Sequence, residues 1–132
     1  TSATHFTIRS NCRRASPACD YCTSILCAIA PDAGLTADDI LAGRTGSSDN
    51  ERTDAALKFA QAVLSEGGRV SDEQLVGVRD AGFSDGEIVE IVARHVLGCF
   101  TNFLNNVADT ELDIPQAEPV AAGVHETCTA GV

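Results

Sequence analysis

Residues 70–88, VSDEQLVGVRDAGFSDGEI, carry the same helix-start signal twice. In each copy a serine is followed three positions later by Gln or Glu, and apolar residues flank the group. The two sets are Val70, Ser71, Gln74, Leu75 and Phe83, Ser84, Glu87, Ile88. Such a serine and its Gln or Glu partner satisfy each other's backbone N–H groups, while the flanking apolar pair packs together. The stretch therefore predicts two consecutive helices separated by Gly82.

The second of these helices is expected to span residues 85–107 and to be unusually apolar. Its apolar residues follow a near-heptad spacing: Ile88, Ile91, Val92, Val96, Cys99, Phe100, Phe103 and Val107. Val89, Leu97 and Leu104 widen that seam. An apolar surface on more than one face predicts a helix buried in the centre of the domain or at a subunit interface.

Three further helices are expected upstream, over residues 18–30, 37–42 and 49–65. Helical spacing of apolar residues supports the first and the third, and Thr36 followed by Asp39 is a start signal for the second. Stretches rich in Gly, Pro and Ser separate them. No segment alternates polar and apolar residues long enough to predict a strand, so the fold class is all-α.

Composition limits the partners. The chain has 132 residues, 44% of them hydrophobic, and a formal net charge of -10. Such a charge opposes binding to nucleic acid or to an anionic membrane, and we expect neither as a partner. Arg9, Arg13 and Arg14 make the first residues a basic lead. Without an apolar run long enough to span a membrane or a recognisable secretory leader, a soluble, reducing, cytoplasmic setting is expected.

Cys19 and Cys22 form a CxxC pair and are the candidate catalytic residues. Ser16 is a good helix cap and Pro17 a good first helical residue, which would place Cys19 in the first turn. Residues three apart share a helix face, and the positive end of the helix favours thiolate over thiol. Asp20 opposes this effect through its negative charge. The pattern favours reversible dithiol and disulfide cycling.

Two other interpretations of the pair stay open. Cys12, Cys19, Cys22 and Cys27 have a spacing that a structural zinc site can use. Five residues along a helix correspond to about 140° around the axis, so Cys27 would face away from Cys22, and no metal or other cofactor is expected. Alternatively, the two cysteines are small buried core residues.

The order of motifs resembles a known family. CDYC at 19–22, AGLTADDI at 33–40, DAALKFAQAVL at 54–64, the capped stretch at 68–93 and FTNFLNNVADTELDIP at 100–115 follow one another. Together they resemble the alkylhydroperoxidase D-like branch of the carboxymuconolactone decarboxylase family. The chain then divides into an unmatched basic lead (1–17), an alkylhydroperoxidase D-like helical domain (18–115) and a tail that is mobile or draped on a partner (116–132).

The resemblance implies a homo-oligomer, commonly a trimer or hexamer, that reduces organic hydroperoxides with its cysteine pair. A protein dithiol or a small thiol would restore the pair. By resemblance Cys22 is the peroxidatic residue and Cys19 the resolving one. Local electrostatics reverse the order, because Cys19 is nearer the helix start, and the assignment stays open.

Two departures from the family pattern concern proton transfer. Leu26 stands where the family places a histidine, and Thr7 stands where it places a glutamate. Loss of such a relay removes about 10² to 10⁴ in rate, so a weak peroxidase is expected. His95 is a candidate substitute base, although its place on the apolar side of the long helix favours a core or interface role. The alternative function is a catalytically degenerate helical oligomer with a structural or binding role.

Overall fold

The computed structural model describes residues 19–118, and all the regular secondary structure in that range is helical. Five helices follow one another: α2 (Asp20–Ile29), α3 (Ala37–Thr45), α4 (Glu51–Ser65), α5 (Asp72–Asp80) and α6 (Asp85–Ala108). No strand occurs among these residues. The expected all-α class is confirmed for the described part of the chain, and the helices lie within a few residues of their predicted positions, with α3 three residues longer than expected.

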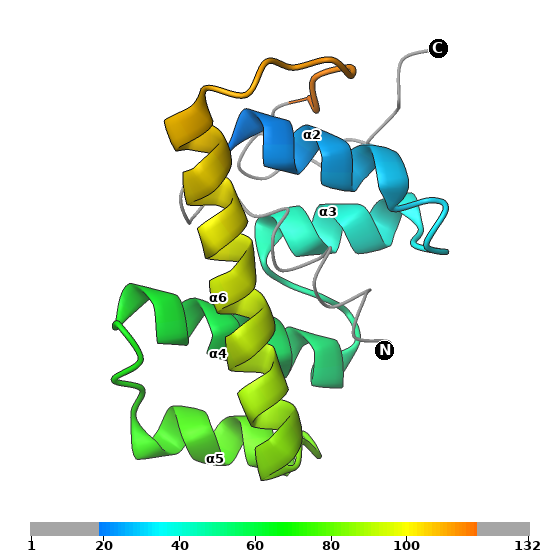
Figure 1. Cartoon of the computed structure of the whole chain (residues 1–132). Helices are drawn as coiled ribbons and strands as arrows, with labels where there is room; N and C mark the ends of the chain where they lie inside the picture. The colour runs from blue at the N-terminus through cyan, green and yellow to red at the C-terminus, as the bar shows by residue number, and fades with distance from the viewer. Residues whose placement is uncertain (1–18, 119–132) are drawn as a thin grey trace.

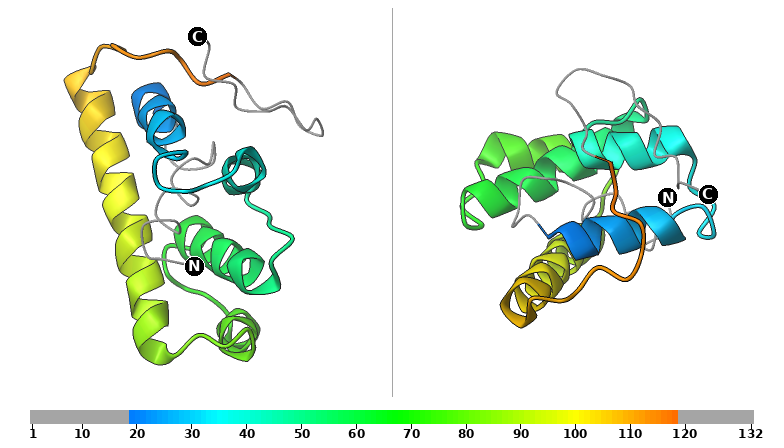
Figure 2. Two further views of the ribbon diagram at one scale, coloured as in Figure 1. Left: turned by 90° about the vertical axis from the view of Figure 1, so that its right-hand side faces the viewer. Right: turned by 90° about the horizontal axis from the view of Figure 1, so that it is seen from above.

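α6 is the long helix that contacts both α4 and α2 (Figure 1). α4 and α5 pack together beside its N-terminal half, and α2 packs against its C-terminal half. Figure 2 shows α6 running along one side of the molecule, with the four shorter helices on the other side. One face of α6 is therefore left without a neighbour from the described part of the chain.

The two helix-start signals at 70–88 are confirmed. Ser71 caps α5 with Gln74 as its reciprocal partner, and Ser84 caps α6 with Glu87. Between the helices Gly82 has φ +88°, a left-handed conformation that costs an L side chain energy and glycine little. The same reciprocal cap occurs at α3, between Thr36 and Asp39. Local sequence thus sets the starts of three helices.

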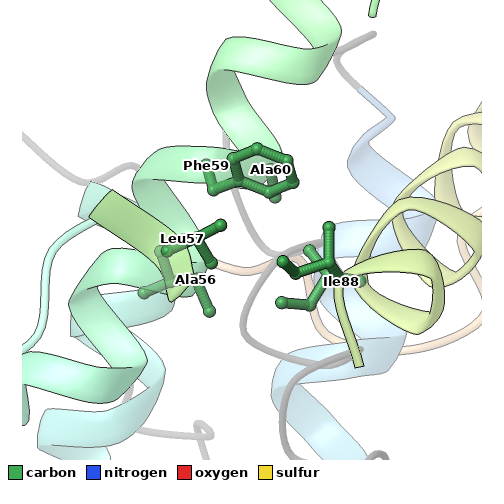
Figure 3. Close-up of a cluster of buried hydrophobic side chains, with 7 residues drawn as sticks. Ala56, Leu57, Phe59, Ala60 and Ile88 are labelled. Atoms are coloured by element: carbon green, nitrogen blue, oxygen red, sulfur yellow. The ribbon is translucent and has the colours of Figure 1, made fainter. Parts of the chain in front are cut away.

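The larger hydrophobic core lies where α4, α5 and α6 meet (Figure 3). Its buried members are Ala56, Leu57, Phe59, Ala60, Val78, Ile88 and Ile91. Val70, Leu75 and Phe83 from the flanking positions of the two caps pack against it. A smaller cluster of Ala30, Leu35 and Ile40 joins the end of α2 to the start of α3.

α6 is not buried in the centre of the domain, which is one of the two alternatives expected from its apolar seam, and the other, a subunit interface, stays a prediction. The residues that α6 buries are Ile88, Ile91, His95, Gly98 and Asn102. The residues that it exposes include Val89, Val96, Leu97, Phe100, Phe103, Leu104 and Val107. In the C-terminal half of α6 the buried residues are His95, Gly98 and Asn102, which are small or polar. We call the exposed set the α6 apolar stripe.

A segment without regular structure, residues 110–118, follows α6 and passes over α2 (Figure 1). The backbone N–H of Ala117 donates to Ser24 Oγ of α2 at 2.9 Å, and Arg44 of α3 donates to the carbonyl oxygen of Glu118. Residues 116–118 of the expected tail are therefore held against α2 and α3 of the same chain.

Several sequence expectations lie outside the described residues. They concern the basic lead with Thr7, Cys12, Ser16 and Pro17, and the remainder of the tail from residue 119 onward. Among the helices that are described, none has both the length and the apolar character needed to cross a membrane.

Candidate functional site

The candidate site is built on the first residues of α2. The helix begins at Asp20, so Cys19 is its N-cap and has extended backbone angles, φ -135° and ψ 103°. The expectation that Cys19 lies in the first turn is wrong, because the helix begins three residues after Pro17, its expected first residue. The consequence is chemical, because an N-cap side chain can accept a hydrogen bond from a backbone N–H that has no partner within the helix. Cys19 Sγ accepts this bond from the N–H of Cys22 at 3.1 Å.

Cys19 and Cys22 are joined by a disulfide, with their Cα atoms 5.2 Å apart. That Cα separation lies within the range that a disulfide bridges without moving the backbone. Both residues are buried, at 4% and 5% exposure. A substrate or reductant therefore reaches the sulfur atoms only if neighbouring groups move.

α6 supplies the second side of the site. The side-chain amide of Asn105 donates from Nδ2 to Cys22 Sγ at 3.4 Å. The same nitrogen donates to the carbonyl oxygen of Thr101 at 2.9 Å, and that oxygen lies 3.9 Å from Cys22 Sγ. Cys22 thus contacts polar atoms of α6 that are far from it in sequence.

Thr110, which follows the C-cap of α6, holds the oxygen end of the Asn105 side-chain amide. Thr110 Oγ1 donates to Asn105 Oδ1 at 2.9 Å, and the N–H of Thr110 donates to the carbonyl oxygen of Asn105 at 3.1 Å. Asp109, the C-cap, has φ 49° in the left-handed region and turns the chain back toward the last turn of α6. A chain of hydrogen bonds therefore runs from the 110–118 segment through Asn105 to the disulfide.

The other sequence candidates lie at varying positions around this site. Leu26 is partly buried and packs against the smaller hydrophobic cluster, as does Cys27. His95 is buried on α6. The structure therefore brings Cys19 and Cys22 together and places Leu26 in apolar packing.

A metal centre has no support among residues 19–118. Within that range no three His, Cys, Asp or Glu side chains gather as a metal site would require. Cys12, the remaining member of the zinc interpretation, lies outside the described residues.

Asn105 and Thr110 are site residues that sequence reasoning missed. Both belong to the stretch FTNFLNNVADTELDIP, which contributes to the family resemblance but not to the predicted site. A weak signal is present, because Asn105 and Asn106 interrupt the apolar residues Phe103, Leu104 and Val107, and an asparagine side chain in a helix can bond a nearby backbone carbonyl. The sequence does not show that α2 packs against the turn of α6 that contains Asn105.

Comparison with known proteins adds no relative. No model of a known protein family matches the chain, and a search of curated proteins finds no match. The functional proposal therefore depends on the geometry of the site and on the motif resemblance.

Proposed function

We propose that the protein is a thiol-dependent peroxidase-like oxidoreductase that cycles Cys19 and Cys22 between dithiol and disulfide. The observation that carries the proposal is that the pair forms a disulfide whose two sulfur atoms each accept a hydrogen bond from an N–H donor. Such donors stabilise the thiolate, the form of cysteine that attacks peroxides and disulfides. The resemblance to alkylhydroperoxidase D-like proteins supplies the substrate class, organic hydroperoxides.

The proposed reaction has three steps. A cysteine thiolate attacks the terminal oxygen of the hydroperoxide, so that an S–O bond forms, the O–O bond breaks and the alkoxide leaves and takes a proton. The second cysteine attacks the resulting sulfenic acid, forms the disulfide and releases water. A dithiol reductant then returns two electrons by thiol exchange and becomes a disulfide itself. A reducing, cytoplasmic environment would supply that reductant.

The activity is expected to be weak. Leu26 occupies the position of the family's histidine and lies in apolar packing, so it supplies no proton to the departing alkoxide. Burial of both cysteines adds the cost of local opening before peroxide reaches the sulfur. The pair therefore has thiolate stabilisation without a base.

Peroxide consumption with dithiothreitol as the reductant tests the proposal. The wild-type chain should consume cumene hydroperoxide, and Cys22→Ser should reduce the rate to the level of dithiothreitol alone. Cys99→Ser is the matched control, because Cys99 is a half-buried cysteine of α6 outside the disulfide, and it should keep the wild-type rate. Equal rates for the wild type and for a variant that carries both Cys19→Ser and Cys22→Ser would overturn the peroxidase proposal.

The second candidate is a helical oligomer with a structural or binding role, and the α6 apolar stripe favours it. The stripe follows one line along the helix, and Val107 at its end is 85% exposed. Monomeric proteins rarely expose a contiguous apolar surface of this kind, whereas a second copy of the chain can cover it. The two candidates are compatible, because an oligomer can also be the active form.

Two valine substitutions test self-association. Val96 on the stripe and Val76 on α5 are similarly exposed, at 56% and 51%. If the stripe is the contact, light scattering at micromolar concentration should find an oligomer for the wild type and for Val76→Glu, and a smaller species for Val96→Glu. A wild-type monomer would reject the oligomer.

A further inference from the structure

We infer that Asn105 is a catalytic residue of the cysteine pair, and that its amide holds the negative charge on Cys22 Sγ when the disulfide opens. The inference rests on the proposed redox function and deepens it, because it assigns a role within the pair. It follows from the contacts of Asn105, which touches the reacting sulfur from an element other than α2.

The orientation of the Asn105 amide is determined by its neighbours. Nδ2 has two hydrogens, and it has two acceptors, Thr101 O at 2.9 Å and Cys22 Sγ at 3.4 Å. Oδ1 accepts from Thr110 Oγ1 at 2.9 Å. Rotating the amide by half a turn would place Oδ1 beside the Thr101 carbonyl oxygen, where two acceptors repel. The N–H is therefore fixed toward the sulfur.

The bond to sulfur becomes stronger when the disulfide is reduced. A disulfide sulfur is a weak acceptor, whereas a thiolate is charged, and hydrogen bonds to charged groups are about twice as strong as neutral ones. The Thr101 carbonyl has the opposite preference, since it can accept only from a neutral thiol. Asn105 is thus the α6 group that favours the thiolate of Cys22 over its thiol.

Among residues 19–118, charged side chains near the pair do not supply this stabilisation. Residues 95–108 of α6 contain no Asp, Glu, Lys or Arg, and the titratable side chains there are His95 and Cys99. On α2 the charged side chain is Asp20, which is exposed and disfavours a thiolate. The acidic residues of the 110–118 segment are Glu111, Asp113 and Glu118. Within the described residues, the side-chain group that contacts Cys22 Sγ and favours its charge is therefore a neutral donor.

This contact assigns roles to the two sulfur atoms. When a reductant thiolate attacks Cys19 Sγ, a new S–S bond forms to the reductant, the Cys19–Cys22 bond breaks, and its electron pair remains on Cys22 Sγ beside Asn105. A second thiolate of the reductant then releases Cys19. In the forward direction the thiolate held by Asn105 is the one that attacks the peroxide, which makes Cys22 peroxidatic and Cys19 resolving.

Alkylation of the reduced protein tests the inference without peroxide. Iodoacetamide reacts with thiolates, and peptide mapping separates Cys19 from Cys22. Asn105→Leu keeps the shape of the side chain and removes the donor. It should slow alkylation of Cys22 about tenfold near neutral pH, the effect of losing a hydrogen bond to a charged group, and change Cys19 less than about threefold. It should also shift the dithiothreitol equilibrium toward the disulfide.

Substitutions at two further positions separate orientation from packing. Thr110→Val removes the donor that orients the amide and should slow Cys22 alkylation in the same direction by a smaller factor, whereas Thr110→Ser should retain the wild-type rate. Asn106→Leu, on the exposed side of the same turn, should have no effect. These variants also test the inference if Asn105→Leu does not fold.

The outcomes distinguish this inference from the proposed function. Unchanged Cys22 alkylation in folded Asn105→Leu and Thr110→Val would overturn the role of Asn105, even if wild-type protein consumes peroxide. A selective loss at Cys22, combined with wild-type protein that consumes no peroxide, would support the role of Asn105 in dithiol exchange and reject the peroxidase.

Discussion

The two ends of α6 have different surroundings. The core half consists of α4, α5 and residues 85–94 of α6, and its contacts are mainly apolar (Figure 3). The disulfide half consists of α2, residues 95–108 of α6 and the 110–118 segment. It buries Ser24 and Asn102, contains the Cys22 and Asn105 contact, and turns much of the α6 apolar stripe outward. We propose from this comparison that the core half provides the stability and that the disulfide half provides chemistry and association.

The largest expected effect comes from a substitution that creates a cavity in the core half. Phe59 is 5% exposed in the main cluster, whereas Phe100 on the stripe is 59% exposed. Phe59→Ala should lower the free energy of unfolding by about 3–5 kcal/mol. Phe100→Ala should change the free energy of unfolding of the dissociated chain by less than about 0.5 kcal/mol. Urea denaturation at low protein concentration measures both, and similar losses would remove the distinction between the halves.

A substitution in α2 tests whether the disulfide half lacks only a base. Leu26→His places an imidazole one helical turn beyond Cys22 and should raise hydroperoxide turnover about tenfold or more, within the range for general acid and base catalysis. Because Leu26 packs against the smaller cluster, burial of a polar ring should also cost about 1–3 kcal/mol of stability.

Leu26→Asn is the matched control, with a similar polar burial and no base. It should lose stability to a comparable degree and gain no turnover. If Leu26→His remains folded and is no faster than Leu26→Asn, the missing base is not the only defect, and the non-catalytic candidate is preferred.

A helix cap provides a smaller test of the core half. Ser84 accepts from the N–H of Glu87 at 3.3 Å, and the Glu87 carboxylate accepts from the N–H of Ser84 at 2.8 Å. Ser84→Ala should cost about 1 kcal/mol in thermal or urea unfolding. Ser65→Ala, at the end of α4, is exposed and should cost less than about 0.5 kcal/mol. Equal costs would mean that the cap adds nothing particular to α6.

The smallest expected effect is a pH dependence. The pKa of Glu87 is lowered from its usual value of 4.5, first by the hydrogen bond from the Ser84 backbone and then by Arg52. The pKa of Asp54 is lowered chiefly by the hydrogen bond from Lys58. A carboxyl whose pKa is lower in the folded state adds stability above its unfolded pKa and loses it as the pH falls through the folded value.

Stability should therefore decline as the pH falls below about 4.5. Glu87→Gln should flatten that decline slightly, because the side chain at position 87 then no longer titrates. Urea midpoints measured across the acid range check this, and an unchanged slope in Glu87→Gln would mean that Glu87 contributes nothing to acid unfolding.

The sequence by itself determined the elements that depend on local interactions. The caps at Ser71 and Ser84 involve residues three positions apart, so their geometry is encoded within one helical turn. The closeness of Cys19 and Cys22 has the same origin, although the cap position of Cys19 was missed because the start of α2 was placed too early.

Only the tertiary structure decided which face of α6 is buried and what touches Cys22. The apolar spacing of α6 is compatible with several buried faces, and the choice depends on where α2 packs, which no local pattern contains. Asn105 lies 83 positions from Cys22 in the chain, and the two meet because α2 crosses the last turns of α6. A contact of that separation is fixed by packing of the whole domain, and it is the contact to which we assign the charge on the sulfur.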